Sequence, residues 1–379
     1  MKYFIIAGEQ SGDLHGSNLV KGIMDADANC EIQCWGGELM ETAGAKLLMH
    51  YRDLAFMGVT AVIRNLGNIR RNFRTCRRQI TDLNPDVVIF IDYPGFNLRM
   101  AKFASRSGFR TFYYISPKFW AWNEGRVRKV KKYIDRMFII FPFEVGFYKR
   151  HGIDVEYYGN PLVDEIERKK TAMPPENEIR AALGVVNKPV IALLAGSRRH
   201  EIEMVLPLMV KMIKYLPEYC FILAGVKNIP DEYYRKFTGD AGIMMVKEMT
   251  YEILRISEAA LVTSGTATLE AALLDVPQVV CYKGDFLTMI IAWIVIRVKY
   301  ISLVNLIMKS EIVRELVQYK LTETRLLSEL RAILPGGEKL KRIRDGYQAL
   351  KSELGPAGAS SRMAREMVAS LAAEQTDHH

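Results

Sequence analysis

A carboxylate stands directly after one of the most apolar stretches of the chain. Residues 87–91 read Val-Val-Ile-Phe-Ile, typical of a strand covered on both faces, and Asp92 follows them. Proteins built from alternating strands and helices bind ligands at the carboxyl ends of their parallel strands. Partial burial there would raise the pKa of Asp92 toward the range that a general base needs. A second interpretation remains equally open, in which Asp92 caps a turn or helix that begins at Pro94.

The first apolar run ends in a loop of glycines and polar residues, Ala7-Gly-Glu-Gln-Ser-Gly-Asp13. Glycines permit a tight turn, and a helix that starts here would offer free N–H groups to an anion. The pattern is not Gly-x-Gly-x-x-Gly, so no dinucleotide fingerprint is met. The loop favours a ligand-contacting role, with Glu9, Ser11, Gly12 and Asp13 as candidates. The alternative is an ordinary strand-to-helix turn in which Ser11 and Asp13 are caps.

Two similar turns occur in the second half of the chain. Residues 194–201 read Leu-Ala-Gly-Ser-Arg-Arg-His-Glu, which suits a phosphate held by N–H groups, the Ser197 hydroxyl and the Arg198 guanidinium. No Walker ending follows, and a solvated helix start is the alternative. Residues 263–270 read Thr-Ser-Gly-Thr-Ala-Thr-Leu-Glu, and their start offers another anion nest at Ser264, Gly265 and Thr266. Glu270 could accept hydrogen bonds from sugar hydroxyls, although by itself an exposed helix glutamate is the better interpretation.

Alternating strands and helices must position these turns. In the first half the expected helices include 17–25 and 98–107, and the expected strands are 3–7, 32–35, 87–91, 111–115, 137–141 and 155–158. In the second half the expected strands are 190–195, 219–224, 243–246, 260–263 and 278–282. Strands separated by helices indicate parallel sheets and an α/β fold.

Polar segments that contain proline and glycine suggest where the domains begin and end. Residues 168–177 are polar and contain two adjacent prolines, which favours a linker, and Leu-Pro-Gly-Gly at 334–337 closes the second α/β half. We therefore expect Rossmann-like domains at 1–167 and 178–337, facing a central cleft that is the default site. The helical remainder, 338–379, is expected to pack back on the first domain.

Composition limits the class of protein. With 379 residues, 49% hydrophobic and 25% charged, the chain is long enough for two or three globular domains and is not a disordered or fibrous sequence. Fifty-two lysines and arginines against 43 acids give a net charge of +9, which favours an anionic partner. Five scattered cysteines and a start without a signal peptide indicate a reducing, cytoplasmic location. Neither metal-ligand spacing among the six histidines nor a Gly-x-Ser-x-Gly elbow occurs, so we expect no metal and no serine hydrolase.

An apolar run of eleven residues, 286–296, is followed by Arg-Val-Lys. It is too short for a bilayer span, which needs about 20 residues. A buried core helix is one interpretation. We favour a surface segment that enters the membrane interface, and its candidate membrane contacts are Phe286, Leu287, Ile290, Trp293 and Ile294.

Two basic stretches would support such an interaction. Residues 64–78 contain six arginines and no acid, and residues 126–136 contain six basic residues and one acid. No nucleic-acid motif accompanies them. Their partner is therefore expected to be an anionic lipid surface or a phosphorylated lipid, with a solvated face as the alternative.

Taken together, these segments resemble the lipid-A-disaccharide synthase family, glycosyltransferases of the GT-B architecture. The shared motifs occur in the family's order over about 300 residues, and the most specific is Ser-Pro-x-x-Trp-Ala-Trp; they lie at 7–13, 91–97, 115–122, 194–198, 264–270 and 300–306. The resemblance implies transfer of 2,3-diacylglucosamine from its UDP derivative to 2,3-diacylglucosamine 1-phosphate (lipid X). The products are the β-1,6-linked disaccharide 1-phosphate and UDP.

The resemblance also implies roles for individual residues. Asp92 corresponds to the general base for the acceptor hydroxyl, and Arg198, with Ser197 beside it, to the arginine at the donor phosphates. Glu270 and Asn305 correspond to nucleotide contacts, and Glu9, Ser11 and Asp13 to the loop near the sugars. The family requires no metal or other cofactor, acts at the inner-membrane surface, and leaves open a homodimer with exchanged carboxyl-terminal helices. The chain departs from the family pattern at Gly95, Lys118 and Val304. Two alternatives to the implied reaction stay open: another GT-B-type nucleotide-sugar enzyme, such as a UDP-sugar 2-epimerase or a different lipid-linked transferase, and a basic membrane- or nucleic-acid-binding protein without catalysis.

Overall fold

A computed structural model of the chain describes residues 1–54, 66–117, 119–122, 124–239, 242–284 and 299–377. The chain divides into two compact units. Unit 1 comprises residues 1–164 and 355–379, and unit 2 comprises residues 165–354. Among the described residues, no helix is long and apolar enough to cross a membrane.

Unit 1 is built on a seven-stranded sheet in the order β3-β2-β1-β4-β5-β6-β7, and every neighbouring pair is parallel. The six strands expected in this half are confirmed to within two residues at each end: β1 Lys2–Ala7, β2 Glu31–Gly36, β4 Val87–Ile91, β5 Arg110–Tyr114, β6 Arg136–Ile139 and β7 Glu156–Tyr157. Strand β3, Lys46–His50, was not expected. All five residues of β4 are buried, because helices cover both faces of the sheet.

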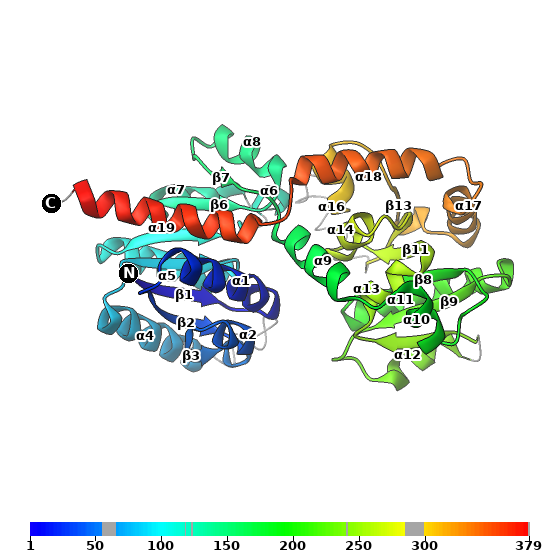
Figure 1. Cartoon of the computed structure of the whole chain (residues 1–379), viewed down its shortest axis with the longest axis horizontal. Helices are drawn as coiled ribbons and strands as arrows, with labels where there is room; N and C mark the ends of the chain where they lie inside the picture. The colour runs from blue at the N-terminus through cyan, green and yellow to red at the C-terminus, as the bar shows by residue number, and fades with distance from the viewer. Residues whose placement is uncertain (55–65, 118, 123, 240–241, 285–298, 378–379) are drawn as a thin grey trace. The chain divides into compact units, whose positions relative to one another are not determined.

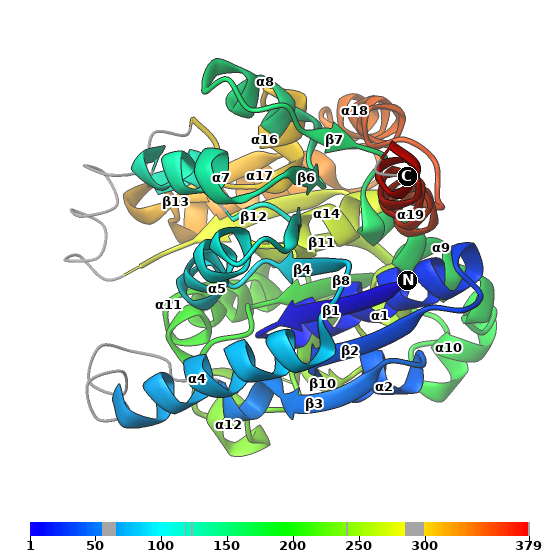
Figure 2. The same cartoon turned by 90° about the vertical axis from the view of Figure 1, so that its left-hand side faces the viewer.

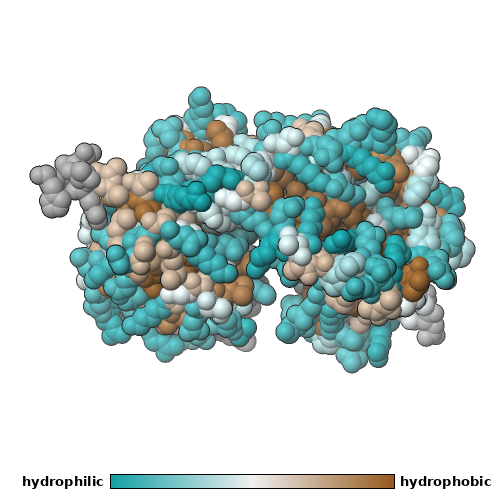
Figure 3. Space-filling model, in the orientation of Figure 1, coloured by the Kyte–Doolittle hydropathy of each residue, from teal (hydrophilic) through white to brown (hydrophobic). Residues whose placement is uncertain are grey.

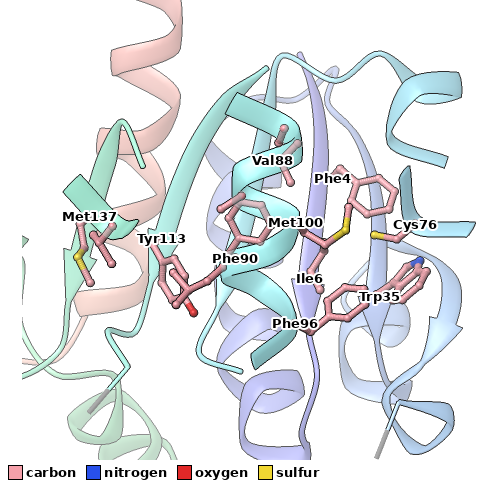
Figure 4. Close-up of a cluster of buried hydrophobic side chains, with 14 of the residues drawn as sticks. Phe4, Ile6, Trp35, Cys76, Val88, Phe90, Phe96, Met100, Tyr113 and Met137 are labelled. Carbon is pink, nitrogen blue, oxygen red and sulfur yellow. The ribbon is translucent and has the colours of Figure 1, made fainter. Parts of the chain in front are cut away.

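One face of the unit 1 sheet packs against α4 (Leu66–Leu83), α5 (Pro94–Arg106) and α7 (Val127–Tyr133). Figure 4 shows the side chains in this layer, among them Phe90 of β4, Met100 of α5 and Cys76 of α4. Other helices among the described residues of unit 1 are α1 Gln10–Ala26, α2 Glu38–Thr42, α6 Phe119–Trp122, α8 Pro142–Arg150 and α19 Ala359–Asp377.

Helix α19 returns to unit 1 and lies along α1 (Figure 1). The helices approach closely, because a β-carbon at Gly22 of α1 would lie 2.7 Å from Cβ of Ala364. The Asp164 carboxylate accepts N–H bonds from Gly358, Ala359 and Ser360 at 2.6, 3.1 and 3.0 Å, which caps the start of α19.

Unit 2 contains a second parallel sheet in the order β10-β9-β8-β11-β12-β13. The five expected strands are present as β8 Val190–Leu194, β9 Cys220–Gly225, β10 Met244–Lys247, β11 Ser257–Thr263 and β12 Gln278–Tyr282. The edge strand β13, Arg314–Val317, was not expected. The helices that the structure describes in unit 2 are most of α9 (Pro161–Ala172), α10 Glu176–Ala182, α11 Arg199–Val210, α12 Asp231–Thr238, α13 Thr250–Arg255, α14 Ala267–Leu273, α16 Leu303–Met308, α17 Glu323–Ile333 and α18 Leu340–Leu354.

Two expectations about the domain boundaries are wrong. Residues 168–177 are not a linker, because α9 runs through Ala172, α10 begins at Glu176, and the units divide within α9 between Asp164 and Glu165. The carboxyl-terminal tail does not return as a whole, since α18 belongs to unit 2. The buried Tyr347 hydroxyl of α18 donates to the Val276 carbonyl at 3.1 Å and accepts from Gln278 Nε2 at 3.1 Å.

The surface follows ordinary globular patterning. In Figure 3 hydrophilic residues cover most of the visible face of each unit, and hydrophobic residues form scattered patches. The expected membrane contacts at 286–294 lie outside the described residues.

Candidate active site

Asp92 lies at the carboxyl edge of the unit 1 sheet, immediately after β4. Asp92 and Tyr93 both have left-handed backbones, with φ of 41° and 47°. Such conformations cost non-glycine residues free energy and persist where neighbours fix them. Here Asn97 Nδ2 donates to the Asp92 carbonyl at 2.8 Å, and the buried Tyr113 hydroxyl donates to the same oxygen. The main chain of the predicted base is therefore held from two sides, and its side chain is half-buried.

The loop after β1 packs against this turn. The ring of Tyr93 lies against the backbone of Gly8, and its hydroxyl donates to the Leu54 carbonyl at 3.0 Å. Burial, with the nearby Glu9 carboxylate as a smaller cause, raises the pKa of Tyr93. Glu9 and Ser11 are exposed at the start of α1, where they remain candidates for substrate contact. Gly12 is buried, and a β-carbon there would lie 3.2 Å from Cβ of Ala7, so a larger residue at this position would crowd the end of β1.

Asp13 has a structural role at a different helix from the one that the sequence analysis gave as the alternative. Its carboxylate is 2% exposed and accepts N–H bonds from Gly37 and Met40 at 2.8 and 3.1 Å through Oδ1, and from Leu39 at 3.2 Å through Oδ2. The expectation of a substrate contact is therefore not supported for this side chain. Nor does Asp13 cap its own helix: it caps α2.

A buried acid at the same edge escaped the sequence reasoning. Glu144, in the first turn of α8, is 1% exposed, and it accepts hydrogen bonds from the Ser116 hydroxyl at 2.6 Å and Trp120 Nε1 at 3.1 Å. Its other oxygen accepts the Phe141 N–H at 3.1 Å. Burial raises the pKa of Glu144 to about 7, although these hydrogen bonds oppose the rise. The Ser-Pro-x-x-Trp motif is therefore anchored through its serine and its first tryptophan.

In unit 2, the N–H groups of the turn after β8 were expected to be available to a phosphate, but they are already hydrogen-bonded. Gly196 has φ of 103°, and the Glu201 carboxylate accepts the N–H groups of Ser197 and Arg198 at 3.0 and 3.2 Å. These backbone donors, expected to hold a phosphate, are thus bound by a side chain of the same helix, α11. The Arg198 side chain is 77% exposed, and its guanidinium lies 3.8 Å from Glu201. Arg198 therefore keeps most of its hydrogen-bonding capacity for a ligand.

The turn after β11 presents a second set of candidates in unit 2. Gly265 and Thr266 are exposed, whereas the Ser264 hydroxyl donates to the Ile301 carbonyl at 2.8 Å. Glu270 of α14 is half-buried, and burial together with the Glu165 carboxylate raises its pKa to about 7. A carboxyl group poised near neutrality in this way is characteristic of functional sites.

Asn305, expected to contact the nucleotide, is fully buried and fully hydrogen-bonded. Its Nδ2 donates to the Val313 carbonyl and to Glu315, both at 2.8 Å, and its Oδ1 accepts N–H bonds from Ile312 and Val313 at 2.8 and 3.0 Å. Glu315 also accepts the N–H groups of Ile301 and Ser302 at 3.0 Å each. Asn305 therefore holds the 301–305 segment against β13. It is linked to Ser264 only indirectly, because Glu315 binds both Asn305 and the Ile301 N–H, and the Ile301 carbonyl accepts the Ser264 hydroxyl.

Within the described part of the chain, no group of three or more histidine, cysteine, aspartate or glutamate side chains could hold a metal ion.

Comparison with solved structures identifies the type of fold. UDP-GlcNAc 2-epimerase from Neisseria meningitidis, bound to UDP-GlcNAc, matches 98% of this chain and 100% of its own with a TM-score of 0.65 at 13% identity. A putative UDP-N-acetylglucosamine 2-epimerase from Listeria monocytogenes matches 96% of this chain and 94% of its own with a TM-score of 0.66 at 14% identity. The likeness assigns the two parallel-sheet units to the GT-B type of fold.

Sequence comparison identifies the family. The family model described as lipid-A-disaccharide synthetase matches residues 3–369. Lipid-A-disaccharide synthase of Geobacter metallireducens is 35% identical over 96% of this chain and 95% of its own length. The synthase of Syntrophus aciditrophicus is 36% identical over 95% of both chains, and that of Coxiella burnetii is 34% identical over 95% of this chain and 96% of its own. The chain therefore belongs to the lipid-A-disaccharide synthase family of glycosyltransferases.

Proposed function

We propose that this glycosyltransferase moves 2,3-diacylglucosamine from UDP-2,3-diacylglucosamine to the 6-hydroxyl of 2,3-diacylglucosamine 1-phosphate. The products are the β-1,6-linked disaccharide 1-phosphate and UDP. The family match over nearly the whole chain carries the proposal. The strained and doubly anchored position of Asp92 supports it.

The proposed step is a single displacement with inversion at the anomeric carbon. The acceptor oxygen attacks that carbon, the bond from the carbon to the diphosphate oxygen breaks, and UDP leaves with the bonding electrons. Asp92 removes the proton from the attacking hydroxyl, a role that typically contributes 10²–10⁴-fold to the rate. Fixing the main chain of Asp92 restricts the positions that its carboxylate can take relative to a bound acceptor.

For unit 2 we propose the donor-binding role. The exposed Arg198 guanidinium would neutralise negative charge that develops on the departing diphosphate. Glu270 would accept hydrogen bonds from the ribose hydroxyls, which stabilise its ionised form and lower its raised pKa. The Ser264–Thr266 turn would lie beside the same nucleotide.

Both proposed substrates carry acyl chains and a phosphate or diphosphate. We therefore propose that the enzyme works in the cytoplasm at an anionic membrane surface and binds it peripherally. The net charge of +9 supports this location.

The test is turnover with UDP-2,3-diacylglucosamine and lipid X dispersed in detergent, in which disaccharide and UDP are followed together. We expect equal amounts of both products and a β-anomeric proton in the NMR spectrum of the disaccharide. Asp92→Asn should lower kcat by roughly 10²–10⁴-fold while leaving the Kd of UDP unchanged.

Asp154→Asn, the same chemical change at an exposed carboxylate of unit 1, is the matched control and should keep wild-type kcat. Wild-type turnover by Asp92→Asn would remove Asp92 from the base role. UDP release without a disaccharide, or conversion of UDP-GlcNAc alone to its epimer, would contradict the proposed reaction.

A further inference from the structure

Three helices of unit 1 enclose a basic groove of about 930 Å³. Figure 2 shows α5 between α4 and α7 on one side of the sheet. Nine lysines and arginines line this groove, and no acid is among its lining residues; the nine are Arg70, Arg74, Arg77, Arg99, Lys102, Arg106, Arg128, Lys129 and Lys132.

Helical spacing explains how the cations converge. On α4 they recur at intervals of four and three residues, at 70, 74 and 77, and on α5 at intervals of three and four, at 99, 102 and 106. Such intervals place side chains on one face of a helix. The two basic stretches of the sequence, 64–78 and 126–136, thus contribute to the same surface, and α5 between them adds three more cations.

The cations are exposed, whereas the floor between them is half-buried and aromatic. Arg99 lies over the ring of Phe73 with 5.6 Å to its centroid, and Arg77 lies over Phe103 at 5.1 Å. Stacking on a ring fixes a guanidinium plane and leaves its N–H edge free to meet an oxyanion. The same arrangement covers the ring faces on which nucleobases would stack, which disfavours single-stranded nucleic acid.

Among the described residues, none of the nine cations forms an ion pair with an acid. The other 43 lysines and arginines of the chain equal its 43 acids, so the groove accounts for the whole surplus of +9. Like charges this close repel one another and oppose folding. An anionic ligand that neutralises them would remove this repulsion.

We propose that this groove is the docking site for phosphate headgroups of an anionic glycerophospholipid surface. The nine cations are spread over three helices and carry more positive charge than one phosphate can neutralise. Several phospholipid headgroups, each with one negative charge, could neutralise them together. The choice of lipid over a free anion rests on the proposed function, in which both substrates lie in a membrane. The inference places the electrostatic part of membrane contact on unit 1, where the sequence analysis had expected the two basic stretches to meet an anionic lipid surface.

The experiment measures co-sedimentation of the full chain with vesicles of phosphatidylcholine and phosphatidylglycerol, and with vesicles of phosphatidylcholine alone. The test variant is Arg70→Gln/Arg74→Gln/Lys132→Gln. Its matched control is Arg71→Gln/Arg78→Gln/Lys131→Gln, which removes two arginines from α4 and a lysine from α7 but none from the groove. Each cation near an anionic surface contributes about fivefold to partition, so the test variant should bind the anionic vesicles about 100-fold more weakly at low salt.

We expect the control variant and the wild type to bind anionic vesicles alike and phosphatidylcholine vesicles weakly. Equal losses in both variants would overturn the groove as the site. Displacement from vesicles by glycerol 3-phosphate at concentrations that leave the ionic strength unchanged would overturn the lipid source in favour of a free phosphate. The lipid assignment would also be overturned if a single-stranded oligonucleotide bound more tightly than the anionic vesicles and this binding depended on the groove cations.

Turnover with detergent-dispersed substrates separates this inference from the proposed function. The groove variant should keep wild-type kcat in detergent and lose activity only on substrates embedded in anionic vesicles. A wild-type chain that binds vesicles through the groove but makes no disaccharide would refute the proposed reaction and leave the docking site standing.

Discussion

The ring of Tyr93 fills the space that any side chain at position 8 would need: a β-carbon on Gly8 would lie 2.2 Å from Cδ1 of Tyr93. Tyr93 directly follows the proposed base, Asp92, and both residues have left-handed backbones. The loop after β1 and the turn after β4 are therefore in contact through a glycine and an aromatic ring. A displacement of the ring that also shifts the Tyr93 main chain would reach Asp92 through one peptide bond.

Gly8→Ala should consequently impair catalysis without removing a functional group. The added methyl must push the Tyr93 ring aside, and a misplacement of about 1 Å at a reacting group can cost about 100-fold in rate. We expect kcat to fall roughly 10- to 100-fold and the Kd of UDP, measured by calorimetry, to stay unchanged. Gly95→Ala is the control, because a β-carbon there would meet no described atom within 4 Å. Equal effects of the two substitutions would show that the contact with Tyr93 does not matter.

The sequence predicted all the interior strands and two of the four edge strands, β7 and β10, and it missed the other two edge strands, β3 and β13. Strand β4 reads as a continuous apolar run, whereas β13 reads Arg-Glu-Leu-Val and takes its strand conformation from pairing with β12. The linker was misplaced because prolines report where a helix ends and not where contacts between units cease. Prolines 174 and 175 separate α9 from α10, several residues after the boundary at Asp164.

The sequence also located the turns of the candidate site but not which polar groups are already satisfied. A strand, a glycine and a helix start can be read from local pattern. The partners of Asp13 lie 24 to 27 residues away, and those of Asn305 lie 7 to 10 residues away, on the unexpected strand β13 or in the two residues before it. Hydrogen bonds across such separations depend on the fold, so a polar residue in a motif that suggests ligand binding can be structural.

Asp13→Ala should reveal such a structural role. Three N–H groups at the start of α2 would lose their acceptor in a buried site, which we expect to destabilise the protein by about 2–4 kcal/mol. Ser11→Ala, at an exposed position two residues earlier, should change the free energy of unfolding by less than about 0.5 kcal/mol. Urea midpoints of the two variants provide the measurement. An Asp13→Ala protein of wild-type stability with weakened substrate binding would restore Asp13 to the substrate site.

Glu201 competes with an anion for the turn after β8. Its carboxylate accepts the N–H groups of Ser197 and Arg198, and the proposed function places the Arg198 guanidinium beside the diphosphate. Glu201→Gln keeps an oxygen acceptor for the helix cap and removes the negative charge. We expect the affinity for UDP to rise about fivefold, equivalent to about 1 kcal/mol for a charge removed near the protein surface.

Calorimetric titration with UDP measures this effect, and Glu203→Gln on the same helix is the control. Glu203 accepts a hydrogen bond from the Tyr233 hydroxyl at 2.6 Å and does not contact the turn. Weaker binding of UDP by Glu201→Gln would mean that the carboxylate orients Arg198 and does not compete with the ligand.

Glu270 should make stability fall as the pH rises toward neutrality. Its pKa in the folded protein is about 7, well above its ordinary value, because it is partly buried beside Glu165. Between about pH 4.5 and 7 the folded state therefore binds more protons at this site than the unfolded state does, so the free energy of unfolding decreases as pH increases through this window. Glu270→Gln removes that dependence. Relative to the wild type, the variant should gain about 1 kcal/mol on going from pH 5 to pH 8, a modest figure because the side chain is partly exposed.

Thermal unfolding of both proteins across this range measures the difference, with Glu176→Gln, at an exposed position on α10, as the control that should show no such trend. If Glu270 contacts the ribose as proposed, the same substitution weakens UDP binding while it stabilises the free protein at pH 8. A destabilised Glu270→Gln protein at pH 8 would contradict the electrostatic account, since it would mean that the ionised carboxylate makes favourable contacts within the fold. Unchanged UDP affinity combined with the expected gain in stability would separate the two roles and remove Glu270 from the nucleotide site.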